Sequence, residues 1–166
     1  MDKIYQHIGE YVVSFQWLEN KIRTIGWFIL DPNNENHPQK ELREENTSKL
    51  FKKFEELFLE ALPKCNLPFD LENDFRSSLK TNSELFQKIR KARNDILHSA
   101  YLELKAGSDI MGIMKSNPKL NDSEMLTEKS FNKEIKNMAE FALFLNRCHM
   151  QLIQRYKLPN KNEETQ

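Results

Sequence analysis

Apolar side chains recur every three or four residues through the first thirty positions of the chain, and this spacing constrains the fold more than any other feature. It predicts one amphipathic helix from about Asp2 to Leu30, with Asp2 as a suitable N-cap. The apolar positions are Ile4, Ile8, Tyr11, Phe15, Leu18, Ile22, Ile25 and Ile29. At a rise of about 1.5 Å per residue this helix is about 40 Å long.

The same spacing predicts three further helices. They run from about Thr47 to Leu62, from about Asp70 to Ala100, and from Thr127 or Ser130 to about Leu158. The second helix starts either at Thr47 or near Pro38, because good helix formers lie between these two positions. Thr81, Asn82 and Ser83 are natural helix caps, and they predict an interruption of the third helix.

A different pattern separates the third helix from the last. Short apolar runs around Gly107 predict a small β-hairpin from Tyr101 to Lys115, followed by a loop from Ser116 to Asp122. The predicted fold class is therefore all-α: a helical bundle of four to five helices, two of them long, with a small β-hairpin inserted before the last helix. We expect a single domain over residues 1–158 and a polar tail over 159–166.

The formal charges of the 166 residues cancel, since 25 Lys and Arg stand against 25 Asp and Glu. This balance argues against a uniformly basic nucleic-acid-binding protein and against a basic membrane-surface protein. It does not argue against a local basic patch. Between Arg76 and Arg93 lie six basic side chains and one acidic side chain, so the third helix is such a patch.

The N-terminal sequence and the two separate cysteines predict a cytoplasmic protein whose thiols are reduced. The chain opens with no apolar signal segment, and no apolar run approaches the ~18 residues of a membrane span. Cys65 and Cys148 lie far apart and in no metal-binding pair. We therefore expect no disulfide scaffold, no metal site and no cofactor.

One group of side chains near the end of the third helix could carry chemistry. On a helical wheel the core-facing stripe consists of Leu85, Ile89, Ala92 and Ile96. The opposite face carries Gln87, Lys91, Asn94 and His98. Arg93 lies on the flank, and we expect its stem to follow Phe86 and Leu97 while its guanidinium points outward. Asn94 and His98 are neighbours, one turn apart.

An arginine, an amide and a histidine at one helix end suit phosphate chemistry. Arg93 would hold a phosphodiester with its planar set of donors, His98 would act as general base or acid, and Asn94 would orient the phosphate or the imidazole. Arg93 and His98 are about 140° apart around a helix, so one helix cannot direct both at one small target. A second copy, packed antiparallel across a dimer axis, would place two of each around a shared groove.

A structural interpretation of the same residues is also open. An arginine followed by a histidine at this spacing arises often by chance, although an asparagine directly after the arginine makes it rarer. A surface histidine near a helix C-terminus is favoured by the helix dipole. In this interpretation Asp95 is simply the partner of His98.

The string from Arg93 through Asn94 and Asp95 to His98 resembles the signature of the HEPN superfamily, the higher eukaryotes and prokaryotes nucleotide-binding domains. In that family an arginine is followed, after a spacer of about four to six residues, by a histidine, and Asn, Asp or His commonly stands directly after the arginine. The family's motif lies toward the end of the third helix of a helical bundle, before a variable insertion and a final helix. The position of Arg93 and His98 in the predicted fold is similar.

The resemblance implies a homodimer whose two motifs face each other and, in active members, metal-independent cleavage of RNA. His98 would deprotonate the ribose 2′-OH or protonate the leaving 5′-oxygen, and Arg93 would stabilise the charge on phosphorus. It also implies a toxin or phage-defence effector, often beside a nucleotidyltransferase-type antitoxin. Other family members are inactive, so a non-catalytic binding or dimerisation module that works with a partner protein or a nucleotide remains the alternative.

Several other side chains are candidates for supporting roles. Lys91 and Asp95 adjoin the motif, and Glu19 either orients the motif or pairs with Arg23 on its own helix. His149 is either a core histidine or a second site residue. Trp17 and Trp27 either stack on bases or pack in the interior, whereas His7 and His37 are predicted to be ordinary surface or loop residues.

Overall fold

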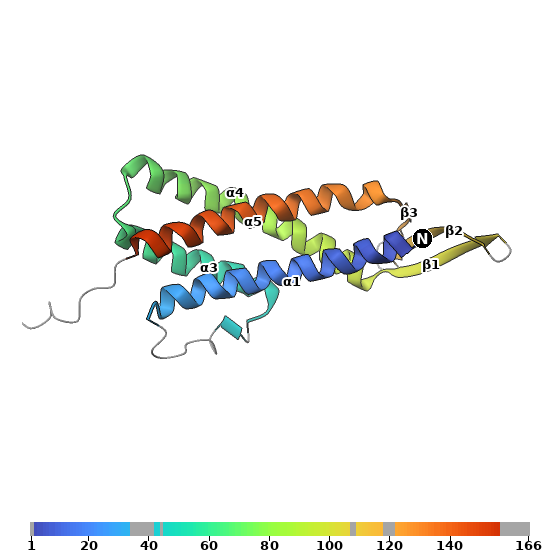
Figure 1. Ribbon diagram of the computed structural model, residues 1–166, viewed down its shortest axis with the longest axis horizontal. Helices are drawn as coiled ribbons and strands as arrows, with labels where there is room; N and C mark the ends of the chain where they lie inside the picture. The colour runs from blue at the N-terminus through green and yellow to red at the C-terminus, as the bar shows by residue number, and fades with distance from the viewer. Residues whose placement is uncertain (1, 34–41, 44, 107–108, 118–121, 157–166) are drawn as a thin grey trace, which may run out of the picture. The chain divides into compact units, whose positions relative to one another are not determined.

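The computed structural model describes residues 2–33, 42–43, 45–106, 109–117 and 122–156. In this part of the chain it contains four α-helices, a short 3-10 helix and one antiparallel sheet of three strands (Figure 1). Their bounds are α1 Asp2–Leu30, α3 Thr47–Ala61, η1 Leu62–Cys65, α4 Phe69–His98, β1 Ala100–Ala106, β2 Asp109–Asn117, β3 Asp122–Leu126 and α5 Glu128–Arg155. The predicted helical fold with a small β insertion before the last helix is confirmed.

The chain divides into two compact units, and each is described by itself. The motif unit consists of Met1–Leu18 and Leu85–Glu140, and the helical unit consists of Glu19–Glu84 and Phe141–Gln166. The motif unit therefore holds the sheet, the first part of α1 and the last part of α4.

A cluster of phenylalanine rings forms the core of the helical unit. On α3, Phe51, Phe54 and Phe58 are fully buried, and their neighbouring ring centroids lie 5.4 and 5.7 Å apart. The ring of Phe141 on α5 lies 5.4 Å from Phe51, and Phe75 on α4 meets Phe58 edge to face at 5.8 Å. Burying a side chain of this size stabilises a fold by roughly 1.5–3 kcal/mol.

Local signals in the sequence fix both ends of α3. Its N-cap is Asn46, whose side chain accepts a hydrogen bond from the backbone N–H of Lys49 at 3.1 Å. At the other end the chain tightens into η1, and Asn66 adopts a left-handed conformation with φ 48° that closes the turn. The start at Thr47 is thereby confirmed, and the residues around Pro38 lie outside the described part.

The third helix is longer and more regular than expected. It begins at Phe69, directly after Pro68, and continues to His98 without a break. The predicted interruption near Thr81, Asn82 and Ser83 is therefore wrong. The reason is local, because the Asn82 side chain donates a 2.8 Å hydrogen bond to the carbonyl of Ser78 and so bonds within the helix instead of capping a new one.

The sheet of the motif unit follows α4 directly. β1 and β2 pair as an antiparallel hairpin with Leu102 opposite Met114, and the register shifts between Leu104 and Lys105. The predicted hairpin is confirmed, but β2 continues to Asn117 and pairs with a third strand, β3. The predicted loop from Ser116 to Asp122 is therefore wrong at both of its ends, and residues 118–121 lie outside the described part.

In the motif unit, α1 packs against α4 through aromatic side chains. The rings of Phe15 and Phe86 are stacked with centroids 6.2 Å apart, and the buried hydroxyl of Tyr11 donates a 3.1 Å hydrogen bond to the carbonyl of Ile89. Ile113 on β2 and Leu126 on β3 are also buried, so one face of the sheet contributes to the same core. Burial raises the pKa of Tyr11, and the carboxylate of Glu134 adds to this shift.

The last helix begins at Glu128, as predicted, and ends at Arg155, whereas the predicted end at Leu158 lies outside the described residues. Helical spacing predicts a buried stripe through Phe131, Ile135, Met138, Ala142, Leu145, His149, Leu152 and Tyr156. Phe131, Met138, Leu145 and Leu152 are buried as predicted, but Ile135 is 37% exposed, and Phe141, Phe144 and Cys148 beside the stripe are buried as well. Among the described helices, none is both long enough and apolar enough to span a bilayer.

Candidate functional site

A heptad-like stripe on α4 carries the key arginine. Buried positions on this helix alternate in steps of three and four, and Arg93 falls on the same stripe. The positions are Phe75, Leu79, Asn82, Phe86, Ile89, Arg93 and Ile96. The predicted stripe through Leu85 and Ala92 is therefore centred too far to one side, because it leaves out the fully buried Phe86; Asn82 and Arg93 on the observed stripe are half-buried. Arg93 occupies a place that an apolar side chain would normally fill.

The guanidinium of Arg93 lies against the core and does not point outward as expected. Its Cζ atom lies 5.5 Å from the centroid of the Phe15 ring on α1, a distance typical of a cation–π contact. Its Nη1 atom donates a 3.0 Å hydrogen bond to Oδ1 of Asn94. Asn94 thus orients the arginine, and both side chains are half-buried.

The backbone of this turn is held by α1 as well. Tyr11 donates to the carbonyl of Ile89, which is the carbonyl that receives the helical hydrogen bond from the N–H of Arg93 in a regular α-helix. The contacts of Tyr11 and Phe15 therefore fix both the backbone and the side chain of the arginine.

His98 is the last residue of α4 and is exposed. Leu97 beside it is 41% exposed, and Lys91 is also exposed. The imidazole and the half-buried guanidinium of Arg93 thus differ in their surroundings, in keeping with the large angle between their positions on the helix.

Asp95 has a partner that the sequence did not suggest. Its Oδ2 atom accepts a 2.6 Å hydrogen bond from Nζ of Lys115 on β2, and the same ammonium contacts Oε1 of Glu124 on β3 at 2.5 Å. The Lys115 side chain is only 14% exposed. Burial opposes its charge, but the hydrogen bonds to Asp95 and Glu124 outweigh burial and raise the pKa of Lys115.

Two further side chains close the end of α4. The Ser99 hydroxyl donates to the carbonyl of Asp95 at 2.6 Å, and the Tyr101 hydroxyl donates to the carbonyl of Ile96 at 2.6 Å. These are carbonyls of the last helical turn, where helical partners run out. Burial raises the pKa of Tyr101 and so keeps its hydroxyl protonated as a donor.

Sequence reasoning missed Lys115 and Tyr101 as site residues. They are direct partners across the β1–β2 pair, and Lys115 is the direct partner of Glu124 across the β2–β3 pair. Directly paired residues share a face of a sheet. The register, which a single sequence does not reveal, therefore aligns all three side chains toward α4. The alternation of polar and apolar residues along 101–105 indicates a strand but not which face packs on α4, since Leu102 and Leu104 are exposed.

A cavity of about 270 Å³ lies beside this row of side chains in the motif unit. Ile96, Leu126 and Phe131 form part of its apolar wall, and Asp95, Lys115 and Glu134 are among its polar residues. Among the described residues no cluster of His, Cys, Asp and Glu has an arrangement that could hold a metal ion.

The candidate Glu19 belongs to the helical unit. Glu19 accepts a 2.5 Å hydrogen bond from the Thr47 hydroxyl, while Arg23 donates to the backbone carbonyls of Leu42 and Glu45. The structure therefore ties Glu19 to α3.

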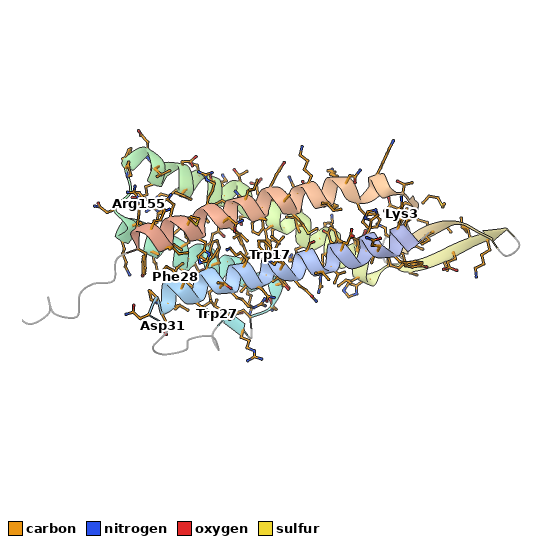
Figure 2. All side chains as sticks on the ribbon, viewed as in Figure 1. Lys3, Trp17, Trp27, Phe28, Asp31 and Arg155 are labelled. Atoms are coloured by element: carbon orange, nitrogen blue, oxygen red, sulfur yellow. The ribbon has the colours of Figure 1, made fainter. Side chains whose placement is uncertain are left out.

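His149 is partly buried on α5. Its Nδ1 atom lies 2.9 Å from Nζ of Lys21, and the ring of Phe28 meets the imidazole edge-on with the centroids 6.1 Å apart. Figure 2 labels Phe28 near the C-terminal end of α1. Burial and, after it, the charge of Lys21 lower the pKa of His149, so its neutral imidazole accepts from the lysine ammonium.

The other histidine and the tryptophans occupy ordinary positions. His7 stacks on Phe131 with centroids 5.7 Å apart, and its Nδ1 atom lies 3.2 Å from Glu10. Trp17 is 48% exposed, whereas Trp27 is partly buried. His37 lies outside the described residues.

Comparison of the chain with models of protein families, with curated proteins and with solved structures gives no match.

Proposed function

We propose that the chain is a metal-independent endoribonuclease of the HEPN type, in which Arg93 and His98 carry the reaction. One observation carries this proposal: an arginine occupies an apolar stripe position of α4, held by Phe15 and Asn94, five residues before an exposed histidine at the helix end. A charge on a largely buried stripe costs stability, and the contacts with Asn94 and Phe15 offset that cost and hold the guanidinium in place.

In the proposed reaction, His98 removes the proton from the ribose 2′-OH, and the 2′-oxygen forms a bond to phosphorus. The bond between phosphorus and the 5′-oxygen breaks, and the leaving oxygen takes up a proton from a protonated imidazole. The products are a 2′,3′-cyclic phosphate and a 5′-hydroxyl. Arg93 stabilises the negative charge that develops on the phosphoryl oxygens.

Charge along α4 supports RNA as the substrate. In the motif unit, the segment from Leu85 to Arg93 contains four basic side chains and no acidic one. Such a segment attracts a phosphate backbone even though the net charge of the chain is zero. Because Arg93 and His98 face different surroundings on one helix, the complete site requires a second copy of the chain. By resemblance, the biological role is that of a toxin or an antiviral effector, with a nucleotidyltransferase-type antitoxin as partner.

The test compares cleavage of a defined RNA in EDTA by the wild type and by His98→Ala, Arg93→Ala and His7→Ala. We expect the first two variants to lose at least about 100-fold in rate, because each removes a group that acts in the transition state. His7→Ala is the matched control and should cleave as the wild type does. A 2′-deoxy substitution at the cleaved nucleotide should abolish cleavage. Equal cleavage by the wild type and His98→Ala, or no cleavage by either, would contradict the proposal.

A second candidate is a non-catalytic binding module, and the contacts of Arg93 are the observation that favours it. Because the guanidinium already binds Asn94 and Phe15 within the chain, Arg93 could serve packing alone. In that case RNA would remain intact, and the protein encoded beside this one would bind the wild type, Arg93→Ala and His98→Ala equally tightly.

A further inference from the structure

Three hydrogen bonds from outside the helix hold the last turn of α4. Lys115 binds the carboxylate of Asp95, Tyr101 binds the carbonyl of Ile96, and Ser99 binds the carbonyl of Asp95. Two of these donors belong to strands β1 and β2. The sheet and the turn that carries His98 are therefore bonded directly, and all of these residues lie within the motif unit.

The end of a helix is where such bonds matter most. Its last carbonyls lack helical partners and usually fray or bind a glycine-containing turn. Here the residue after His98 is Ser99, and the chain enters β1 at Ala100. The order of the last turn therefore depends on side chains that reach it from the sheet.

Lys115 is the centre of this arrangement. Its ammonium is largely buried and lies between two carboxylates, Asp95 of α4 and Glu124 of β3. Without the lysine, Asp95 and Glu124 would lose the ammonium that lies between them, and Asp95 would lose this bond to β2. Asp95 lies three residues before His98 on the same helix, so its displacement moves the backbone that carries the imidazole.

We infer that Lys115 is a positioning residue of the proposed ribonuclease site, which holds the last turn of α4 through Asp95 and thereby sets the place of the His98 imidazole. The inference rests on the proposed function. It explains why a small sheet directly follows the motif, since the strands provide the ammonium and the hydroxyl that close the helix. A displacement of about 1 Å at a reacting group can cost about 100-fold in rate. The contacts of Lys115 would therefore affect catalysis although this residue does not contact RNA.

The main test uses Lys115→Met, Lys115→Arg and Lys105→Met in the full chain, with RNA cleavage as the readout. Lys115→Met should lower kcat by about tenfold and leave KM within about twofold, because the group that binds RNA is unchanged. Lys115→Arg keeps the charge and the donors, so it should restore kcat to within about threefold of the wild type. Lys105→Met is the matched control, because this exposed lysine of β1 pairs with Glu103 and not with α4, and its kcat should stay within about twofold.

A second readout does not depend on activity. The proton NMR signal of the His98 imidazole, assigned with His98→Ala, should shift or broaden in Lys115→Met and stay as in the wild type in Lys105→Met. If Lys115→Met does not fold, Tyr101→Phe replaces it, since it removes one hydrogen bond to the same turn.

The outcomes separate this inference from the proposed function. A wild type that cleaves no RNA refutes the ribonuclease, and the NMR signal alone then decides whether the sheet positions His98. An unchanged His98 signal in Lys115→Met overturns the inference, whatever the activity. So does an unchanged kcat in that variant, or a failure of Lys115→Arg to restore it.

Discussion

A single buried hydroxyl ties α1 to the turn of α4 that carries Arg93. Tyr11 is fully buried and donates to the carbonyl of Ile89. We expect Tyr11→Phe to lower the free energy of unfolding by about 1 kcal/mol, the usual value of one buried hydrogen bond. Urea unfolding followed by circular dichroism measures this change.

The matched control for that variant is Tyr5→Phe, because the hydroxyl of Tyr5 donates to Glu103 at an exposed position. Its free energy of unfolding should stay within about 0.5 kcal/mol of the wild type. If both variants lower the free energy of unfolding by the same amount, the buried hydrogen bond from Tyr11 to Ile89 stabilises the fold no more than the exposed one from Tyr5 does.

The contact between Lys21 and His149 makes the stability of the protein depend on pH. Burial and the charge of Lys21 lower the pKa of His149 in the folded state below its ordinary value of 6.5. The unfolded chain therefore binds more protons at this position than the folded chain does as the pH falls below about 6.5. The contribution of this pair to stability is complete above that pH and is lost as the pH falls through the folded pKa.

We expect His149→Gln to flatten the decline of the unfolding free energy between pH 7 and pH 5, because an amide does not titrate. Denaturant titrations at several pH values measure the slope. The same slope in His149→Gln and the wild type would argue against a lowered pKa.

Single residues also show where sequence reasoning succeeded and where it could not. The places of Arg93, Asn94 and His98 on α4 followed from helical spacing. The partial burial of Arg93 was missed, although the seven-residue spacing of Leu79, Phe86 and Arg93 could have indicated it. The partner of Asp95 lies 20 residues away in another element, and no spacing rule connects two residues across a strand register.

At the level of the elements, α3 depends on the cap at its N-terminus. Asn46 accepts from the N–H of Lys49 and satisfies one of the free donors of the first turn. Asn46→Ala should lower the free energy of unfolding by about 1 kcal/mol. Asn46→Ser retains a side-chain acceptor, so it should lose less than about half of that. An equal loss in both variants would show that the cap is not the cause.

The four helices could be predicted from the sequence because each is long, and its apolar side chains repeat over several turns. The third strand could not. Its sequence, Asp122–Leu126, places its two apolar residues together at the end and lacks the alternation of a strand. The strand forms because β2 offers it a partner edge, and Leu126 then fills the core beside Ile113. Because such pairing depends on a neighbouring strand, the sequence of the strand itself does not predict it.

At the scale of the whole molecule, the proposed site requires two chains. We expect a particle of twice the 19.8 kDa mass of one chain in light scattering at micromolar concentration. If the dimer completes the site, mixing an excess of inactive His98→Ala with Arg93→Ala should restore part of the cleavage, since a mixed dimer contains one intact copy of each group. A monomeric mass, or no restoration, would contradict a shared site.

The net charge of the whole chain does not reveal how charge is distributed among its helices. The sum of zero combines a basic segment of α4, from Arg76 to Arg93, with acidic residues elsewhere in the chain, including the first turns of the same helix. The composition correctly argued against a uniformly basic protein, but it did not describe the surface of one helix, where the phosphate-attracting charge lies.

The hydrogen bonds that Tyr101 and Lys115 make to the end of α4 have a consequence for the order of folding. Ile96 and Tyr101 are five residues apart and Asp95 and Lys115 are 20 apart, whereas the bond from Tyr11 to Ile89 spans 78 residues. Contacts between near neighbours close small loops, which form faster than large ones. We therefore expect the helix end and its sheet to assemble early, before the first helix reaches them. The histidine would then acquire its setting while the arginine still lacks the aromatic ring that holds it.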